Sequence, residues 1–110
     1  SITMEELNRI CEELARIAKA LGADEPEIER EAERRLKEQA NREAFIRSSQ
    51  KFLRKVNPRL EHVGYYYDEA AGVEQAVLLF PNRLVNVDVK GLDDTLALTK
   101  ELMWAAADVA

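Results

Sequence analysis

The chain has 110 residues, which suits one domain around a single hydrophobic core. Its composition, 46% hydrophobic and 34% charged, is typical of a soluble globular protein, and no apolar run is long enough to span a membrane. A single cysteine excludes an internal disulfide, and together with a single histidine it excludes a cysteine/histidine zinc cluster. We therefore expect one cytoplasmic domain over residues 1–110, with no leader segment, metal or other cofactor.

The net charge of −5 conceals three regions of different sign. Residues 1–43 carry 12 acids and 8 bases, and residues 61–110 carry 9 acids and 3 bases. Between them, residues 44–60 carry 5 bases and no acid. The sequence thus predicts a basic band between two acidic regions rather than an evenly charged molecule.

The first predicted helix begins near Thr3 and ends at Gly22. Thr3 and Glu6 have the spacing of a capping box, and Gly22 supplies the left-handed residue that commonly ends a helix. Between these ends, apolar side chains recur at alternating spacings of three and four, which places them on one stripe that must be buried. The stripe consists of Leu7, Ile10, Leu14, Ile17 and Leu21.

A second helix is predicted from Glu25 to Val56. Asp24 can cap it, and the short connection after Gly22 folds it back against the first helix as a hairpin. Small apolar residues would face the first helix, and acid–base pairs at i,i+4 would stabilise the exposed side. The facing residues are Ile28, Ala32, Leu36 and Ala40, and the pairs are Glu31–Arg35, Glu33–Lys37 and Glu38–Arg42.

The length of this second helix constrains the fold. Its residues would span roughly 48 Å as one helix, whereas a compact chain of this size has a radius of gyration of about 13 Å. The helix must therefore project from the domain or break, and Asn41 and the Ser48–Ser49 pair are the candidate break points. Its later part belongs to the core through Phe45, Ser49, Phe52, Leu53 and Val56.

Three strands are predicted after Asn57-Pro58, which ends the long helix. They cover residues 60–68, 73–80 and 84–90, and the short turns between them make an antiparallel meander. In the first strand Tyr65 and Tyr67 would point to the core, which leaves Tyr66 exposed.

A last helix is predicted to begin at Asp93 as its cap. Its sheet-facing side would carry Leu96, Leu102, Met103, Ala106 and Val109, while Leu98 and Trp104 are hard to bury together. The predicted fold class is α+β in the order α-α-β-β-β-α. A three-stranded sheet packed by two helices forms the body (residues 44–110), and a helical hairpin (residues 1–43) extends from it.

Two sets of side chains are candidates for binding a macromolecule. Four basic residues share one face of the second helix and could neutralise phosphates of a nucleic acid, or could form an ordinary solvated face: Arg47, Lys51, Arg54 and Lys55. Four further side chains would add more apolar surface than a small domain can bury, and such surface predicts a protein partner or a homodimer. They are Leu7, Leu14, Tyr66 and Trp104.

No residue pattern indicates catalysis. The acid pairs Asp68–Glu69 and Asp93–Asp94 could converge at one end of the sheet, but no base, glycine-rich loop or metal-binding spacing accompanies them. Cys11 lies beside the apolar stripe and reads as a small core residue, and His62 reads as a strand-surface residue. We expect a chain without catalytic, cofactor or metal residues.

The segment LVNVDVKGLDDTLALTKEL, residues 84–102, resembles the strand–turn–helix end of small accessory proteins of phages and mobile elements. Some of these, including acidic anti-CRISPR inhibitors, share an αβββα arrangement. The order is also similar to the double-stranded-RNA-binding domain, but Asp93-Asp94 stands where that family has lysines. Residues 24–43 resemble an idealised designed helix, so an engineered origin is the alternative.

These observations lead to two hypotheses of function. The first is a small acidic, non-enzymatic interaction or inhibitor protein that masks a macromolecular partner, for example a nucleic-acid-binding protein. The alternative is a nucleic-acid-binding module that uses the basic face of the second helix. The sequence alone does not identify the partner.

Overall fold

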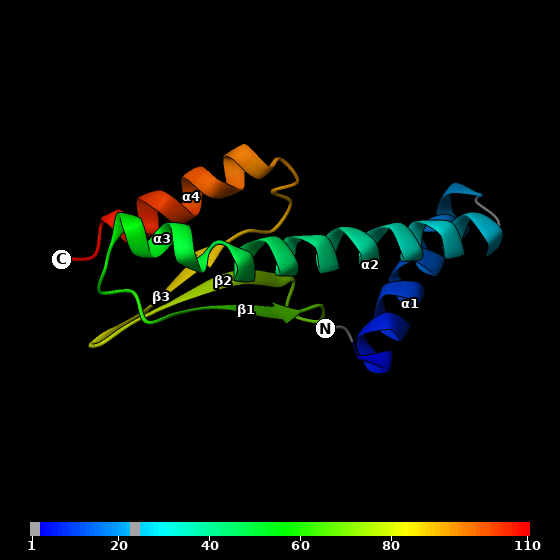
Figure 1. Ribbon diagram of the computed structural model, residues 1–110. Helices are drawn as coiled ribbons and strands as arrows, with labels where there is room; N and C mark the ends of the chain where they lie inside the picture. Colours follow the sequence, from blue (N-terminus) through cyan, green and yellow to red (C-terminus); the bar gives the residue numbers. More distant parts are fainter. Residues whose placement is uncertain (1–2, 23–24) are drawn as a thin grey trace.

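The computed structural model describes residues 3–22 and 25–110, and seven of these, in the first helix and at the start of the second, by backbone alone. The predicted α+β class is confirmed (Figure 1). A three-stranded antiparallel sheet has the order β1-β2-β3 and is accompanied by four helices in the described chain. The elements are α1 (Met4–Leu21), α2 (Glu25–Ser48), α3 (Gln50–Val56), β1 (His62–Asp68), β2 (Val73–Phe80), β3 (Arg83–Asp88) and α4 (Thr95–Ala107).

The long second helix breaks at Ser49, so the element order contains one more helix than predicted. The Ser48 hydroxyl donates to the Phe45 carbonyl at 2.7 Å, and the Ser49 hydroxyl donates to the Ile46 carbonyl at 2.6 Å. Side chains that bond to the preceding turn in this way compete with the helical hydrogen bonds. Of the two candidate break points, the serine pair is therefore correct and Asn41 lies within α2.

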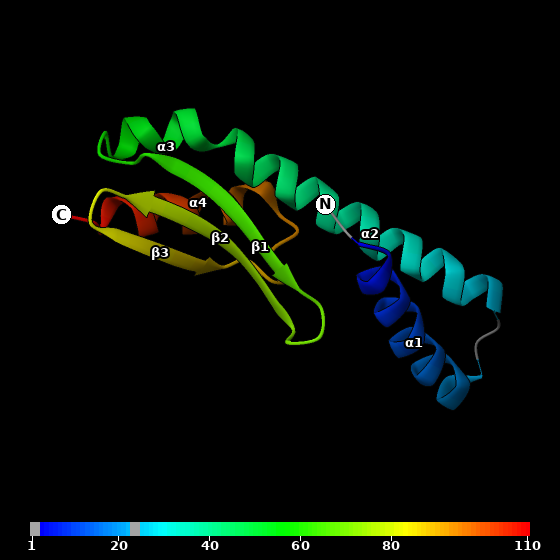
Figure 2. The ribbon, with the colours of Figure 1, turned by 90° about the horizontal axis from the view of Figure 1, so that it is seen from below.

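The sheet, the end of α2 and the helices α3 and α4 enclose one apolar core. Helices cover one face of the sheet, and its other face remains open (Figures 1 and 2). Twelve buried side chains form the core: Ile46, Leu53, Leu60, Val63, Ala76, Leu78, Phe80, Val87, Val89, Leu98, Leu102 and Ala106. The three strands lie within two residues of their predicted bounds.

Two predicted core positions of the body are wrong, and Ile17 of the predicted stripe on α1 is 44% exposed. Phe52 is 45% exposed and Leu96 is 60% exposed. The buried line on α2 and α3 instead passes through Ile46 and Leu53, seven residues apart, and α4 buries Leu98 with residues four and eight further on. Each helix is turned so that its most continuous apolar line meets the sheet, and this turn moves Phe52 and Leu96 outward.

The caps of the helices partly match the sequence. The backbone N–H of Glu6 donates to the Thr3 hydroxyl at 3.1 Å, as the capping box predicts, and Gly22 adopts a positive φ of 78°. Asp24 lies outside the described residues. The cap of α4 is Asp94 rather than Asp93, because Asp94 accepts the Leu96 N–H at 3.0 Å.

The hairpin has a small core of its own. Ile10 on α1 and Ala32 on α2 are buried, and Cys11, Ile28 and Leu36 pack against them. Leu14 and Leu21 lie on α1, but their side chains are outside the described part. Ala40 was predicted to face α1 and is exposed, while Gln39 beside it is buried.

The hairpin gives the molecule an elongated shape. Its principal extents are 51 × 24 × 19 Å and its radius of gyration is 16.3 Å, larger than the about 13 Å of a compact chain of this length. Figure 1 shows α2 leaving the sheet and α1 returning beside it beyond the end of β1. None of the helices in the described parts of the chain has the length and apolarity to cross a membrane.

Candidate interaction surfaces

A buried ion pair joins α2 to the sheet. The Arg42 guanidinium donates from Nε to Glu74 at 2.7 Å and from Nη1 to Asp93 at 2.6 Å. Glu74 also accepts the Tyr65 hydroxyl at 2.5 Å and is only 3% exposed. The predicted Glu38–Arg42 pair is therefore wrong, because Arg42 turns toward the body and Glu38 accepts from Arg34 instead.

This environment raises the pKa of two of the tyrosines of β1. Burial and the hydrogen bond to Glu74 raise the pKa of Tyr65 well above its usual range, and the Gln39 side chain opposes this shift. Burial and a short hydrogen bond to Glu69 similarly raise the pKa of Tyr67. Both phenols therefore stay protonated and act as hydrogen-bond donors rather than as bases.

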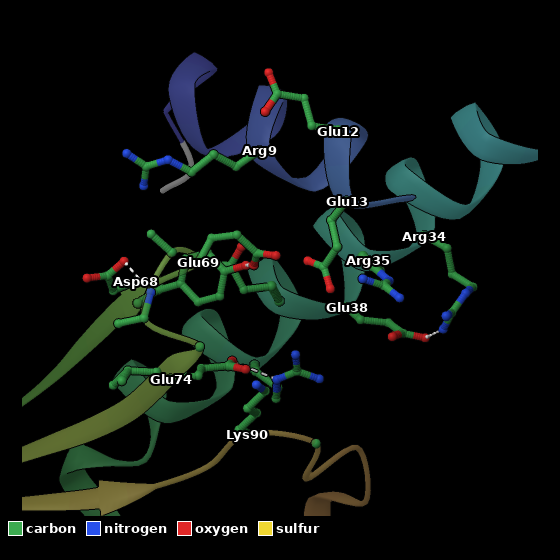
Figure 3. A pocket seen from close by; sticks show the side chains of 18 of the residues that line it. Arg9, Glu12, Glu13, Arg34, Arg35, Glu38, Asp68, Glu69, Glu74 and Lys90 are labelled. Carbon is green, nitrogen blue, oxygen red and sulfur yellow. Dashed lines mark hydrogen bonds and ion pairs between the residues drawn. The ribbon is translucent and has the colours of Figure 1, made fainter. Parts of the chain in front are cut away.

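A charged cleft lies between the hairpin and the end of the sheet (Figure 3). It encloses about 740 Å³ and opens between α1, α2, the β1–β2 turn and the loop after β3. Its charged lining residues are Arg9, Glu12, Glu13, Arg16, Arg34, Arg35, Glu38, Arg42, Asp68, Glu69, Glu74, Lys90 and Asp93. Of the two acid pairs expected at one sheet end, Asp68, Glu69 and Asp93 line the cleft, whereas Asp94 caps α4.

Most of the arginines in this cleft already have acidic neighbours. Arg34 donates hydrogen bonds to Glu31 and Glu38, and Arg9 donates one to Glu5 at 2.6 Å. The Glu13 side chain extends toward Arg35 (Figure 3). The described residues contain no group of three or more histidine, cysteine, aspartate or glutamate side chains arranged to hold a metal ion. The cleft is thus a charge-balanced junction, and its geometry favours a role in positioning the hairpin.

The open face of the sheet, seen from below in Figure 2, carries a second surface with exposed apolar side chains. Tyr66 is 49% exposed, Leu79 38% and Leu84 56%. Leu79 pairs with His62 on β1 and with Leu84 on β3, so these three side chains form one row across the sheet. Val77 lies in the next row, opposite Gly64 and Asn86. We call the residues Tyr66, Val77, Leu79 and Leu84 the open-face patch.

The strand alternation correctly predicts that Tyr66 is exposed, but Leu79 and Leu84 were not identified as surface residues for binding. Residues 76–80 of the second strand are all apolar, and such a run does not reveal that one face lacks a covering layer. The count of helices does not reveal the open face either, because two helical segments after residue 44 could cover one face of the sheet together or one face each.

The predicted basic face is only partly available. Arg47 bonds Glu43 at 3.0 Å, and Arg54 bonds the backbone carbonyls of Leu60 and Glu61 beside β1. Lys51 and Lys55 are exposed on the side of α3 that faces away from the sheet.

The predicted partner-binding residues lie on three separate elements. Leu7 is half-buried on α1, Leu14 has no described side chain, and Trp104 is 63% exposed on the outward side of α4. Tyr66 belongs to the open face of the sheet. The structure therefore does not gather these four residues into one site, and of them only Tyr66 joins the open-face patch.

Comparisons with protein-family models, curated proteins and solved structures gave no significant match. They bear neither on the resemblance to phage accessory proteins nor on an engineered origin, and both stay predictions.

Proposed function

We propose that this chain is a non-enzymatic interaction protein that binds and masks a protein partner through the open face of its sheet. The observation that carries the proposal is the open-face patch, in which Leu79 and Leu84 lie side by side and Tyr66 stands two rows away. Exposed apolar side chains that adjoin one another in this way are typical of protein-binding surfaces. Aromatic anchors such as tyrosine often carry much of the binding energy.

The charges beside the patch indicate the chemistry of the partner. The outward side chains of the three strands include Asp68 and Asp88 and no lysine or arginine. An apolar surface with lysine or arginine at its edge would complement this arrangement. A basic, nucleic-acid-binding surface has this composition, so its masking is the inhibitory role that we infer.

Two leucines of similar exposure provide a matched test. Leu84 on the open face is 56% exposed and Leu96 on α4 is 60% exposed. A partner is first captured from extract with the wild-type chain, and its affinity for Leu84→Asn and Leu96→Asn is then measured by titration calorimetry. We expect Leu84→Asn to weaken binding at least about tenfold and Leu96→Asn to leave it within about twofold. Equal affinities of the two variants would reject the open face as the binding surface.

A second candidate function is binding of single-stranded nucleic acid on the outward side of α3 and α4. It is favoured by Phe52, which is 45% exposed on the same helix as Lys51 and Lys55, and by Trp104 on the neighbouring helix. Lysines that hold a phosphate backbone beside aromatic rings that stack on bases are the usual elements of such a site.

The nucleic-acid alternative is tested with a labelled oligothymidine at low salt. Lys55→Glu is expected to abolish binding, whereas Lys37→Glu, the same charge change on an exposed position of α2, is expected to have little effect. Trp104→Ala should weaken binding of the oligonucleotide but not of heparin, since heparin offers no base to stack. If wild-type protein gives no signal at low salt, this alternative is excluded.

A further inference from the structure

The free edge of β3 suggests a self-association that is independent of the proposed function. We propose that two copies of the chain pair antiparallel along β3 and form a continuous six-stranded sheet. Figure 2 shows β3 at the outer edge of the sheet. The partner in this proposal is a second copy of the same chain.

The hydrogen-bond phase of β3 shows which backbone groups point outward. The N–H of Val89 donates to the Glu74 carbonyl of β2 at 3.0 Å, and Phe80 pairs with Arg83 across a two-residue turn. Alternate residues of an antiparallel strand bond to the same neighbour, so Arg83, Val85 and Val87 bond to β2. The N–H and C=O groups of Leu84, Asn86 and Asp88 therefore point away from the sheet.

The start of the opposite edge of the sheet is already bonded by side chains. On β1 the outward N–H of Val63 donates to the Gln50 side chain at 2.9 Å, and the preceding Leu60 carbonyl accepts from Arg54 at 3.2 Å. In the described part of the chain no comparable side chain bonds the backbone of Leu84 or Asn86. The six residues of β3 also include neither lysine nor proline, which commonly protect strand edges.

One register between the two β3 strands pairs all of the outward N–H and C=O groups of β3. It places a twofold axis at Asn86, so that Asn86 faces Asn86 of the partner subunit and Leu84 faces the partner's Asp88. Each of these pairs exchanges two backbone hydrogen bonds. Moving the register by two residues in either direction leaves an outward residue of β3 without a strand partner.

The side chains are compatible with this register. On the covered face, Val85 lies opposite the partner's Val87, and both strands are apolar there. On the open face, the two Asn86 amides meet at the axis and no like charges stand directly opposite each other. The dimer would also place two open-face patches on one continuous surface.

The proposal is tested first by light scattering after size-exclusion chromatography, with the wild-type chain and variants at position 86. The wild type should have about twice its chain mass of 12.5 kDa at micromolar concentration. Asn86→Lys places two like charges at the axis and should raise the dimer dissociation constant at least about tenfold. Asn86→Thr, a neutral strand-forming residue, is the control and should remain dimeric.

A charge swap tests the register itself. Asn86→Lys and Asn86→Asp should each be monomeric, and mixing them should restore a dimer that contains one copy of each. Hydrogen exchange on the wild type gives an answer that does not depend on any variant, because the Asn86 amide should become protected as concentration rises. A wild type that stays monomeric with a rapidly exchanging Asn86 amide, or a dimer that Asn86→Lys leaves intact, would overturn the proposal.

Discussion

In the described chain, the αβββα body buries twelve side chains in one apolar core, whereas the hairpin buries only Ile10 and Ala32 between its helices. The joint between these regions is polar, because Arg42 reaches from α2 to Glu74 and Asp93. Two buried oxygens at this joint, of Glu6 and Gln39, have no hydrogen-bond partner among the described residues. Burial of apolar area therefore stabilises the body, while directional polar contacts set the position of the hairpin.

The largest expected effect is in the body. Leu53 is fully buried, so Leu53→Ala removes its packing and leaves a cavity, and we expect a loss of about 3 kcal/mol in the free energy of unfolding. Urea denaturation followed by circular dichroism measures this loss. The neighbouring Phe52→Ala is the control, because Phe52 is 45% exposed and should cost less than about 1 kcal/mol. Equal losses for both variants would contradict the assigned orientation of α3.

A similar or slightly smaller effect is expected at the joint. Arg42→Met leaves Glu74 buried without its cation, and removal of one partner of a buried pair costs about 3 kcal/mol. The double variant Arg42→Met/Glu74→Leu should recover part of this loss, because no unpaired charge remains buried. Urea denaturation of the four chains completes a double-mutant cycle. A double variant less stable than either single variant would show that the ion pair is not the dominant interaction.

The hairpin should respond locally rather than globally. Ile10→Ala should weaken the packing of α1 by about 2 kcal/mol, and hydrogen exchange should accelerate in α1 while the strands keep their protection. This result would separate the hairpin from the body as a unit of unfolding. Acceleration of the strands to the same extent would instead show one cooperative unit.

The smallest effect concerns the exposed ion pairs of α2. Hydrogen bonding from Arg34 lowers the pKa of Glu31 below its ordinary value, although partial burial opposes the shift. Because the pKa is lower in the folded chain, the stabilisation is present above pH 4.5 and is lost as pH falls through the folded pKa.

Glu31→Gln should therefore cost about 0.3 kcal/mol near neutral pH and close to nothing in acid. Thermal unfolding at both pH values measures the difference. Glu29→Gln, at an exposed position of the same helix, serves as the matched control. A cost that stays constant between the two pH values would rule out ionisation of Glu31 as its source.

Local signals account for much of the correct prediction. The serine pair interrupts the long helix through bonds to its own preceding carbonyls, and Thr3 and Gly22 mark the ends of α1. Residues 73–80 form β2 with the bounds expected from the two turns that flank them. These features depend on neighbours within about four residues, so the chain encodes them without reference to the rest of the fold.

Contacts between distant segments could not be predicted in the same way. Arg42 has an acid four residues before it, yet it bonds Glu74 and Asp93, which lie 32 and 51 positions away. By sequence, Asp93 and Asp94 are equally good helix caps. In the structure Asp93 accepts a hydrogen bond from Arg42, and Asp94 caps α4.

The sequence by itself determined the α+β class, the three strands and the exposure of Tyr66, and it offered the serine pair as one of two break points of the long helix. These features depend on local hydrogen bonding or on the alternation of a strand. Only the tertiary structure decided which side of each helix meets the sheet, where Arg42 finds its partners and which sheet face remains open. These outcomes depend on how all elements share one limited core, and a single segment does not contain that information.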